Sequence, residues 1–147
     1  MEQQPTHQPL AVAEAAVILI VDDNPDAAHL LFSLLTRLTY TCEMAYGGVE
    51  ALAKIRAHPK DQPLLVILDD MMPDLGGLEV LRELRKDPEF DRLHVVIYSA
   101  RLHAERRDEA LALGAKAWIL KGQDVNTTLN AFVEHYHQAC EDHHDAR

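Results

Sequence analysis

Polar side chains with possible chemical roles follow four short apolar runs of this 147-residue sequence. Asp22 and Asp23 come directly after the run VILIV, and Asp69 comes directly after LLVIL. Ser99 ends the run HVVIYS, and Lys121 follows AWIL. Three carboxylates, a hydroxyl and a lysine together make an environment for a phosphoryl group, provided that the fold brings them to one place.

The three carboxylates also indicate a metal ion. Close carboxylates repel one another, and the repulsion keeps some of them protonated unless a positive charge compensates it. An all-oxygen site suits Mg²⁺, which binds a few carboxylate or carbonyl oxygens and retains several waters. The cation and Lys121 would neutralise charge on the phosphoryl oxygens while a carboxylate attacks. These residue types therefore predict Mg²⁺-dependent phosphoryl chemistry.

The elements that must position these residues alternate along the chain. We expect strands at 17–21, 40–45, 64–69, 94–100 and 117–121, and helices at 24–38, 47–58, 77–87, 104–115 and 125–136. This alternation predicts an α/β domain with a parallel, doubly wound sheet of five strands and five helices. The first, third and fourth strands are continuously apolar and suit the interior, so the expected strand order is 2-1-3-4-5.

Local signals support the first two helices. Asn24 is the expected N-cap of the first helix, and Pro25 fits its first position. Apolar residues at helical spacing follow at Leu30, Leu31, Leu34, Leu35 and Leu38. In the second helix, Val49, Leu52 and Ala53 are expected to share the apolar side.

The strand order predicts where the polar residues lie. In open sheets of this kind, ligands bind beyond the carboxyl ends of the strands, where the strand order reverses. Here that point falls between the first and third strands. The first, third, fourth and fifth strands therefore bring their terminal polar groups to the same edge of the sheet.

The chain resembles a response-regulator receiver domain of two-component signalling, of the CheY-like superfamily. The matching pieces are VDDN, LDDMMPDLGGLEVLRELR, VVIYSA and LGAKAWILK, in that order. The resemblance covers about residues 17–137 and implies a flavodoxin-like fold. It implies that Asp69, four residues before Pro73, accepts the phosphoryl group. It also implies that Mg²⁺ is bound by Asp22, Asp23, Asp69 and the main-chain carbonyl of Met71.

The resemblance assigns roles to three further residues. Ser99 matches the hydroxyl that bonds a phosphoryl oxygen, Lys121 matches the lysine that pairs with the acceptor, and Trp118 matches the aromatic switch position. A histidine kinase or a histidine phosphotransfer protein would supply the phosphoryl group. The protein would catalyse its own phosphoryl transfer and dephosphorylation rather than act as a metabolic enzyme. The surface of the fourth helix, fifth strand and fifth helix would then bind a downstream protein or a second copy of the chain.

Three positions depart from the family pattern. Gly122 replaces the usual proline after Lys121, so the peptide bond between them is either trans or a strained cis bond. Trp118 is larger than the usual aromatic residue, and either turns inward or stays outward as a docking residue. Asp70 stands where an apolar residue is more usual, and we expect it to face solvent rather than bind the cation.

Composition limits the possible partners and location. The formal net charge is −10, which disfavours binding of nucleic acid or an anionic membrane. Cys42 and Cys140 lie far apart and match no metal-ligand spacing, which favours a reducing compartment and hence the cytoplasm. We expect a flexible tail at 1–14, a receiver domain at 15–138, and a C-terminal tail at 139–147. The histidines and cysteine near the C-terminus are interpreted as an exposed, frayed helix end rather than a metal site.

Two other functions compete with a single-domain response regulator. A pseudo-receiver would keep the fold without phosphorylation and act as a protein-interaction module. The acceptor, the acidic pair and the lysine argue against it. A Mg²⁺-dependent phosphatase of the haloacid-dehalogenase type would require Asp-x-Asp after its first strand. The sequences DDNPD and DDMMPD do not provide that spacing.

Overall fold

The computed structural model describes residues 15–145, so the tail expected at 1–14 lies outside the described residues. Five strands and five α-helices alternate, with one short 3₁₀ helix, η1 (Pro88–Phe90), before the fourth strand. The strands are β1 (Val17–Val21), β2 (Thr41–Ala45), β3 (Leu64–Leu68), β4 (His94–Ser99) and β5 (Ala117–Leu120). The helices are α1 (Pro25–Arg37), α2 (Gly48–Ala57), α3 (Gly77–Arg85), α4 (Ala104–Ala112) and α5 (Val125–Asp145).

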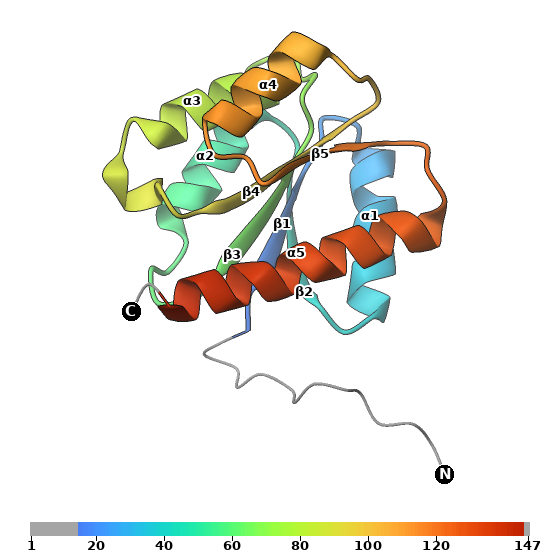
Figure 1. Ribbon diagram of the computed structural model, residues 1–147. Coiled ribbons are helices and arrows are strands. Elements are labelled where there is room, and N and C mark those ends of the chain that lie inside the picture. The colour runs from blue at the N-terminus through green and yellow to red at the C-terminus, as the bar shows by residue number, and fades with distance from the viewer. Residues whose placement is uncertain (1–14, 146–147) are drawn as a thin grey trace.

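All strands are parallel, in the order β2-β1-β3-β4-β5, which confirms the predicted fold (Figure 1). The register aligns the strand ends that matter for the site. Val21 pairs with Leu68, and Ser99 pairs with Leu120. The residues that follow β1, β3 and β5 therefore leave the sheet at the same edge.

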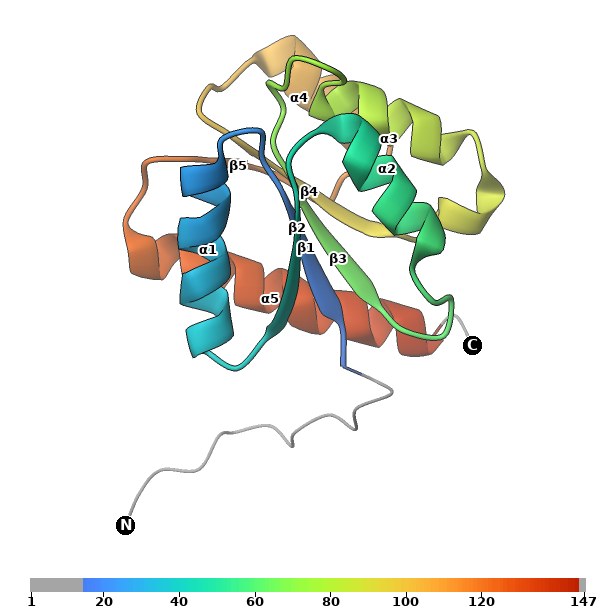
Figure 2. The same ribbon diagram turned by 180° about the vertical axis from the view of Figure 1, so that it is seen from behind.

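Helices cover both faces of the sheet, as Figures 1 and 2 show from opposite sides. One apolar cluster joins the sheet to α1 and α5, and the other joins it to α2, α3 and α4. Every residue of β1 and β3 is buried, because these interior strands are covered on both faces. The site edge is thus supported by two strands that are buried along their whole length.

The predicted buried face of α2 is wrong at two of its three residues, because only Leu52 is buried as predicted. Val49 is 63% exposed and Ala53 is also exposed, whereas Ala51, Leu52 and Ile55 are buried. The reason is the close approach of Gly48 to the loop after β3, where an added Cβ would lie 2.4 Å from the Leu75 carbonyl oxygen. That approach turns the stripe containing Gly48 toward the sheet, with the spacing i, i+3, i+4 and i+7.

The predicted C-terminal tail also needs correction. The helix does not fray at residue 139, because α5 continues to Asp145. Ala139 and Cys140 are buried in the same cluster as Phe132 and Tyr136. The apolar stripe of α5 therefore extends past the predicted boundary and attaches the C-terminal half of the helix to the sheet.

Candidate functional site

The backbone at the carboxyl edge holds the polar residues in fixed positions. The Asp69 N–H donates to the Val21 carbonyl oxygen at 2.9 Å, and the Lys121 N–H donates to the Ser99 carbonyl oxygen at 2.7 Å. These hydrogen bonds continue the strand pairing by one residue beyond β3 and β5. Asp69, Ser99 and Lys121 thus lie side by side at the end of the sheet.

Three carboxylates come together at this edge. Oxygens of Asp22, Asp23 and Asp69 all lie within 4.8 Å of one another, with Asp22 and Asp69 buried. Among the described residues this is the only cluster of three or more potential metal ligands, and the histidines of α5 form none. The all-oxygen donor set fits a hard divalent cation such as Mg²⁺. Met71 lies at the same edge, and its N–H bonds the Asp69 carboxylate.

Lys121 is shared between two of these carboxylates. Its Nζ lies 2.7 Å from Asp22 Oδ2 and 3.7 Å from Asp69 Oδ1. The resemblance implied a partnership with the acceptor, but the shorter contact is to Asp22. Asp22 Oδ1 also accepts a hydrogen bond from the Asn24 N–H at 2.9 Å. Because the charge of Asp22 is already compensated, Asp23 and Asp69 are the carboxylates most available to a cation.

Its surroundings make Asp69 a weaker acid than an ordinary aspartate. Burial raises the pKa of Asp69 to about 6; the charge of Lys121 opposes this increase, and Asp22 and Asp23 add to it. For Lys121, burial lowers the pKa, but the hydrogen bond to Asp22 and the charge of Asp69 outweigh it and raise the pKa. The site therefore keeps a charged lysine beside a carboxylate that would lose its proton more readily near a cation.

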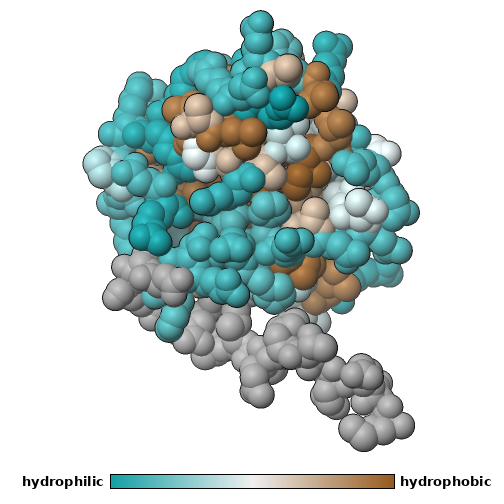
Figure 3. All heavy atoms as spheres, in the orientation of Figure 1, coloured by the Kyte–Doolittle hydropathy of each residue, from teal (hydrophilic) through white to brown (hydrophobic). Residues whose placement is uncertain are grey.

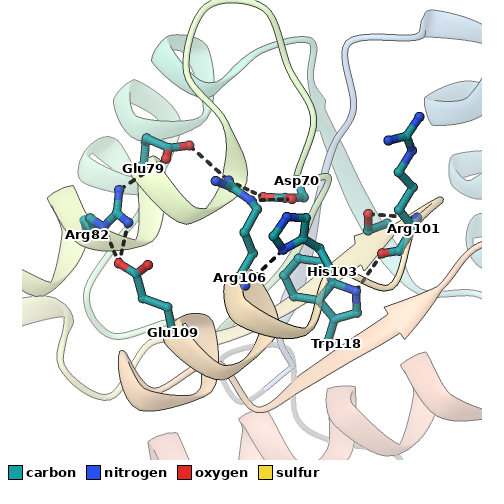
Figure 4. Close-up of polar contacts among 9 residues, drawn as sticks. Asp70, Glu79, Arg82, Arg101, His103, Arg106, Glu109 and Trp118 are labelled. Atoms are coloured by element: carbon teal, nitrogen blue, oxygen red, sulfur yellow. Dashed lines mark hydrogen bonds and ion pairs between the residues drawn. The ribbon is translucent and has the colours of Figure 1, made fainter.

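Ser99 and Trp118, the two residues predicted to form the switch, are joined through one loop. Ser99 is 1% exposed, and its Oγ accepts a hydrogen bond from the Arg101 N–H at 3.2 Å. The Trp118 Nε1–H donates to the Arg101 carbonyl oxygen at 3.0 Å, as Figure 4 shows. The Trp118 ring is half-buried against the α2–α4 cluster. Its position is therefore intermediate between the two predicted alternatives, and its N–H has the partner that a buried indole requires.

Gly122 determines the conformation of the loop after β5. None of the described residues has a cis peptide bond, so the bond between Lys121 and Gly122 is trans. Gly122 has φ +88°, a region that favours glycine. The departure from the family pattern therefore gives a glycine turn that still brings Lys121 to Asp22.

The prediction that Asp70 faces solvent is wrong. Asp70 is 2% exposed, and its carboxylate accepts two hydrogen bonds from Arg106, from Nε at 2.9 Å and from Nη2 at 2.7 Å. Arg106 belongs to α4 and was not among the predicted site residues. No sequence motif marks it, because the two partners are 36 residues apart.

Comparisons with known proteins agree with this geometry. The family model of the response regulator receiver domain matches residues 18–133. The response regulator MprA of Mycobacterium ulcerans is 39% identical over 104 residues, which cover 71% of this chain and 43% of that protein. Hybrid signal transduction histidine kinase D of Dictyostelium discoideum is 31% identical over 105 residues, 71% of this chain and 6% of that protein. The chain thus spans less than half the length of these relatives.

Solved structures give the same result. A CheY-like receiver domain protein from Methanospirillum hungatei matches with a TM-score of 0.76 and 25% identity, covering 87% of this chain and 98% of that one. The chemotaxis protein CheY4 of Vibrio cholerae matches with a TM-score of 0.73 and 26% identity, over 82% of this chain and 98% of that one. Within residues 15–145, no helix has the length and apolar character needed to span a membrane.

Proposed function

Because the chain belongs to the response regulator receiver domain family of two-component signalling, we propose that it accepts a phosphoryl group on Asp69 and signals by protein contact. The donor is the phosphohistidine of a histidine kinase or of a histidine phosphotransfer protein. Action as a single domain in the cytoplasm is part of this proposal. The single observation that carries it is the cluster of Asp22, Asp23 and Asp69 with Lys121 bridging two of its members.

Mg²⁺ is the proposed cofactor of the reaction. Asp22, Asp23, Asp69 and the Met71 main-chain carbonyl would hold it, with Asp23 and Asp69 as the least compensated carboxylates. When bound, the cation supplies positive charge against the oxygens of the transferring phosphoryl group. The all-oxygen donor set and the excess of negative charge both support this choice.

Three side chains of the protein carry out the other steps of the proposed phosphoryl transfer. The Asp69 carboxylate attacks phosphorus in line, forming a P–O bond as the P–N bond to the donor histidine breaks. The Lys121 ammonium, fixed by Asp22, neutralises charge near the acceptor. The Ser99 hydroxyl donates a hydrogen bond to a phosphoryl oxygen of the product. The Arg101 main chain is hydrogen-bonded to both Ser99 and Trp118. A shift of Ser99 would therefore also displace Trp118, the proposed aromatic switch.

The proposed signalling surface consists of α4, β5 and α5. Leu102 is 57% exposed just before α4, and Leu111 within α4 is 44% exposed. Figure 3 shows a largely hydrophilic face with hydrophobic groups in its upper half, in the region of α4 and β5. A downstream protein would cover these apolar side chains, and a second copy of the chain is the other proposed partner.

Phosphorylation in solution tests the proposal. The protein is incubated with Mg²⁺ and acetyl phosphate, and the intact mass is measured. The wild-type chain and Asp70→Asn should each gain one phosphoryl group, whereas Asp69→Asn should gain none. Asp70 is the matched control because it is an adjacent carboxylate committed to Arg106. If the wild type gains no phosphoryl group either from acetyl phosphate or from a phosphohistidine donor, the result would instead support the pseudo-receiver alternative.

A further inference from the structure

Helix α4 has unusually little apolar attachment to the rest of the protein. Ala110 is the only buried residue of its nine. The neighbouring α3 has the same length and buries five of its residues: Gly77, Leu78, Val80, Leu81 and Leu84. Apolar burial therefore fixes α3 firmly, while the position of α4 depends more on polar contacts.

The polar contacts of α4 are directed to α3 and to the acceptor loop (residues 69–76), which carries Asp69. Glu109 accepts a hydrogen bond from Arg82 Nε of α3 at 2.7 Å. Arg106 donates to Glu79 of α3 at 3.3 Å, and donates twice to Asp70. Figure 4 shows these side chains as a connected row between the two helices, with Arg106 reaching toward Asp70.

Among these contacts, the pair of Asp70 and Arg106 has the geometry of a rigid link. The Asp70 side chain is 3% exposed and that of Arg106 is 26% exposed, and two parallel hydrogen bonds fix their relative orientation. Asp70 follows the acceptor Asp69 directly, and its own carbonyl oxygen accepts the Gly77 N–H at 2.9 Å. The residue that follows Asp69 is therefore tied both to the first turn of α4 and to the start of α3.

The surroundings of the link leave room for movement. A cavity of about 320 Å³ separates the start of α4 from the acceptor loop, and its lining includes Asp70, Met71, Glu79, Ser99, His103 and Arg106. Residues 100–105, which lead into α4, are all exposed. Close packing therefore does not hold this segment against the acceptor loop, and the ion pair spans the gap.

We propose that the Asp70–Arg106 pair is a coupling element that transmits the state of Asp69 to α4, separately from the connection through Ser99, Arg101 and Trp118. The proposal rests on the phosphorylation of Asp69 proposed above. It assigns positioning roles to Asp70 and Arg106, two residues that do not touch the phosphoryl group. The Trp118 connection reports on the loop, and the ion pair moves the helix.

The test compares both connections in the same protein. Asp70→Asn, Arg106→Gln and the double variant are phosphorylated with acetyl phosphate and Mg²⁺, with occupancy of Asp69 measured by mass spectrometry. Amide hydrogen exchange is followed in α4, and fluorescence is followed at Trp118, the only tryptophan of the sequence. The double variant matters because it leaves neither partner as an unpaired charge.

In the variants, we expect the phosphorylation-dependent change of α4 exchange to be largely lost at equal occupancy, while the Trp118 change is retained. Arg107→Gln alters the adjacent arginine, which pairs with Asp108, and Arg82→Gln removes another α3–α4 contact. Both controls should respond like the wild type. A wild-type α4 response in the double variant, or equal loss of both responses, would overturn the proposal.

A second measurement separates this inference from the proposed function. In the protein without acetyl phosphate, loss of the pair should raise amide exchange both in α4 and in residues 70–77, whereas Arg107→Gln should change neither segment. If the wild type takes up no phosphoryl group but both segments loosen, the proposed function fails and the link remains. Unchanged exchange in both segments refutes the link whatever the phosphorylation result.

Discussion

Asp69 and Asp70 are adjacent carboxylates with different environments. Asp69 shares Lys121 with Asp22, at the edge where three carboxylates meet. Asp70 is bonded to Arg106 on the opposite side of the backbone. The separation follows from strand geometry, because successive side chains at the end of β3 point to opposite faces. One residue can therefore take part in chemistry while its neighbour is engaged in a structural contact.

His94 gives a prediction about pH at the other end of the sheet. It is 2% exposed, and its Nε2 lies 3.0 Å from Nδ1 of His135. Burial lowers the pKa of His94 to about 4, and the neighbouring His135 and Lys116 contribute in the same direction. The unfolded chain has a histidine pKa of about 6.5 and takes up the proton first as the pH falls. The contribution of neutral His94 to stability is therefore fully present above about pH 6.5 and is lost progressively toward about pH 4.

The size of this effect is about 3.5 kcal/mol at most, because each pKa unit corresponds to about 1.4 kcal/mol. Urea denaturation of the wild type and of His94→Leu between pH 7 and pH 4 measures it. The variant should lose less stability over this range, while His144→Gln, which alters an exposed histidine of α5, should follow the wild type. Parallel curves for His94→Leu and the wild type would contradict the prediction.

At the scale of elements, periodicity predicted the presence and order of the strands but not every helix face. Continuous apolar runs marked β1, β3 and β4 because only strands covered on both sides have that composition. Val49 and Ala53 were wrongly assigned to the buried side of α2, because the orientation of this helix depends on Gly48, whose contact with the Leu75 backbone is tertiary. The length of α5 was missed because few apolar residues mark its C-terminal half.

The site shows the same division. Asp22, Asp23, Asp69, Ser99 and Lys121 were predicted because each lies at a strand end, and parallel strands bring those ends together. Arg106 was not predicted, since its partner lies 36 residues earlier and its helix is mostly polar. A pairing of this kind becomes visible only when the position of α4 relative to the acceptor loop is known.

The start of α3 provides a prediction at the element scale. In a helix, alanine is normally about 1 kcal/mol more favourable than glycine. At Gly77, however, an added Cβ would lie 2.5 Å from the Asp69 carbonyl oxygen and 3.1 Å from the Asp70 Cα. Gly77→Ala should therefore lower the free energy of unfolding by about 1–2 kcal/mol, because α3 and the acceptor loop must separate.

Chemical denaturation measures the loss of stability, and the rate of phosphorylation by acetyl phosphate measures its consequence for Asp69. The rate should fall along with stability, because the displaced backbone carries Asp69. Ser33→Ala, at an exposed position of α1, gives the ordinary effect of alanine in a helix of the same protein. Stabilisation by Gly77→Ala would show that the acceptor loop moves aside without cost, and that the start of α3 does not fix its position.

At the scale of the whole molecule, negative charge opposes the folded state at the site. The chain carries a net charge of −10, and the fold brings Asp22, Asp23 and Asp69 within 4.8 Å of one another. Lys121 compensates only part of this charge. Global stability and cation binding should therefore be linked, because a cation that binds the folded protein stabilises it by mass action.

This linkage predicts that the difference in stability between Asp23→Asn and the wild type changes sign when Mg²⁺ is added. Without Mg²⁺, the variant should be more stable than the wild type by about 1 kcal/mol, because one repulsive charge is removed. With Mg²⁺ at about a hundredfold excess over its dissociation constant, the wild type should gain about 2.7 kcal/mol and the variant much less. Urea denaturation with and without Mg²⁺, at matched ionic strength, measures both effects. As a control, Asp26→Asn removes an equal charge three residues further along the chain and should be stabilised by Mg²⁺ as much as the wild type. Equally large stabilisation of Asp23→Asn by Mg²⁺ would show that the cation binds elsewhere.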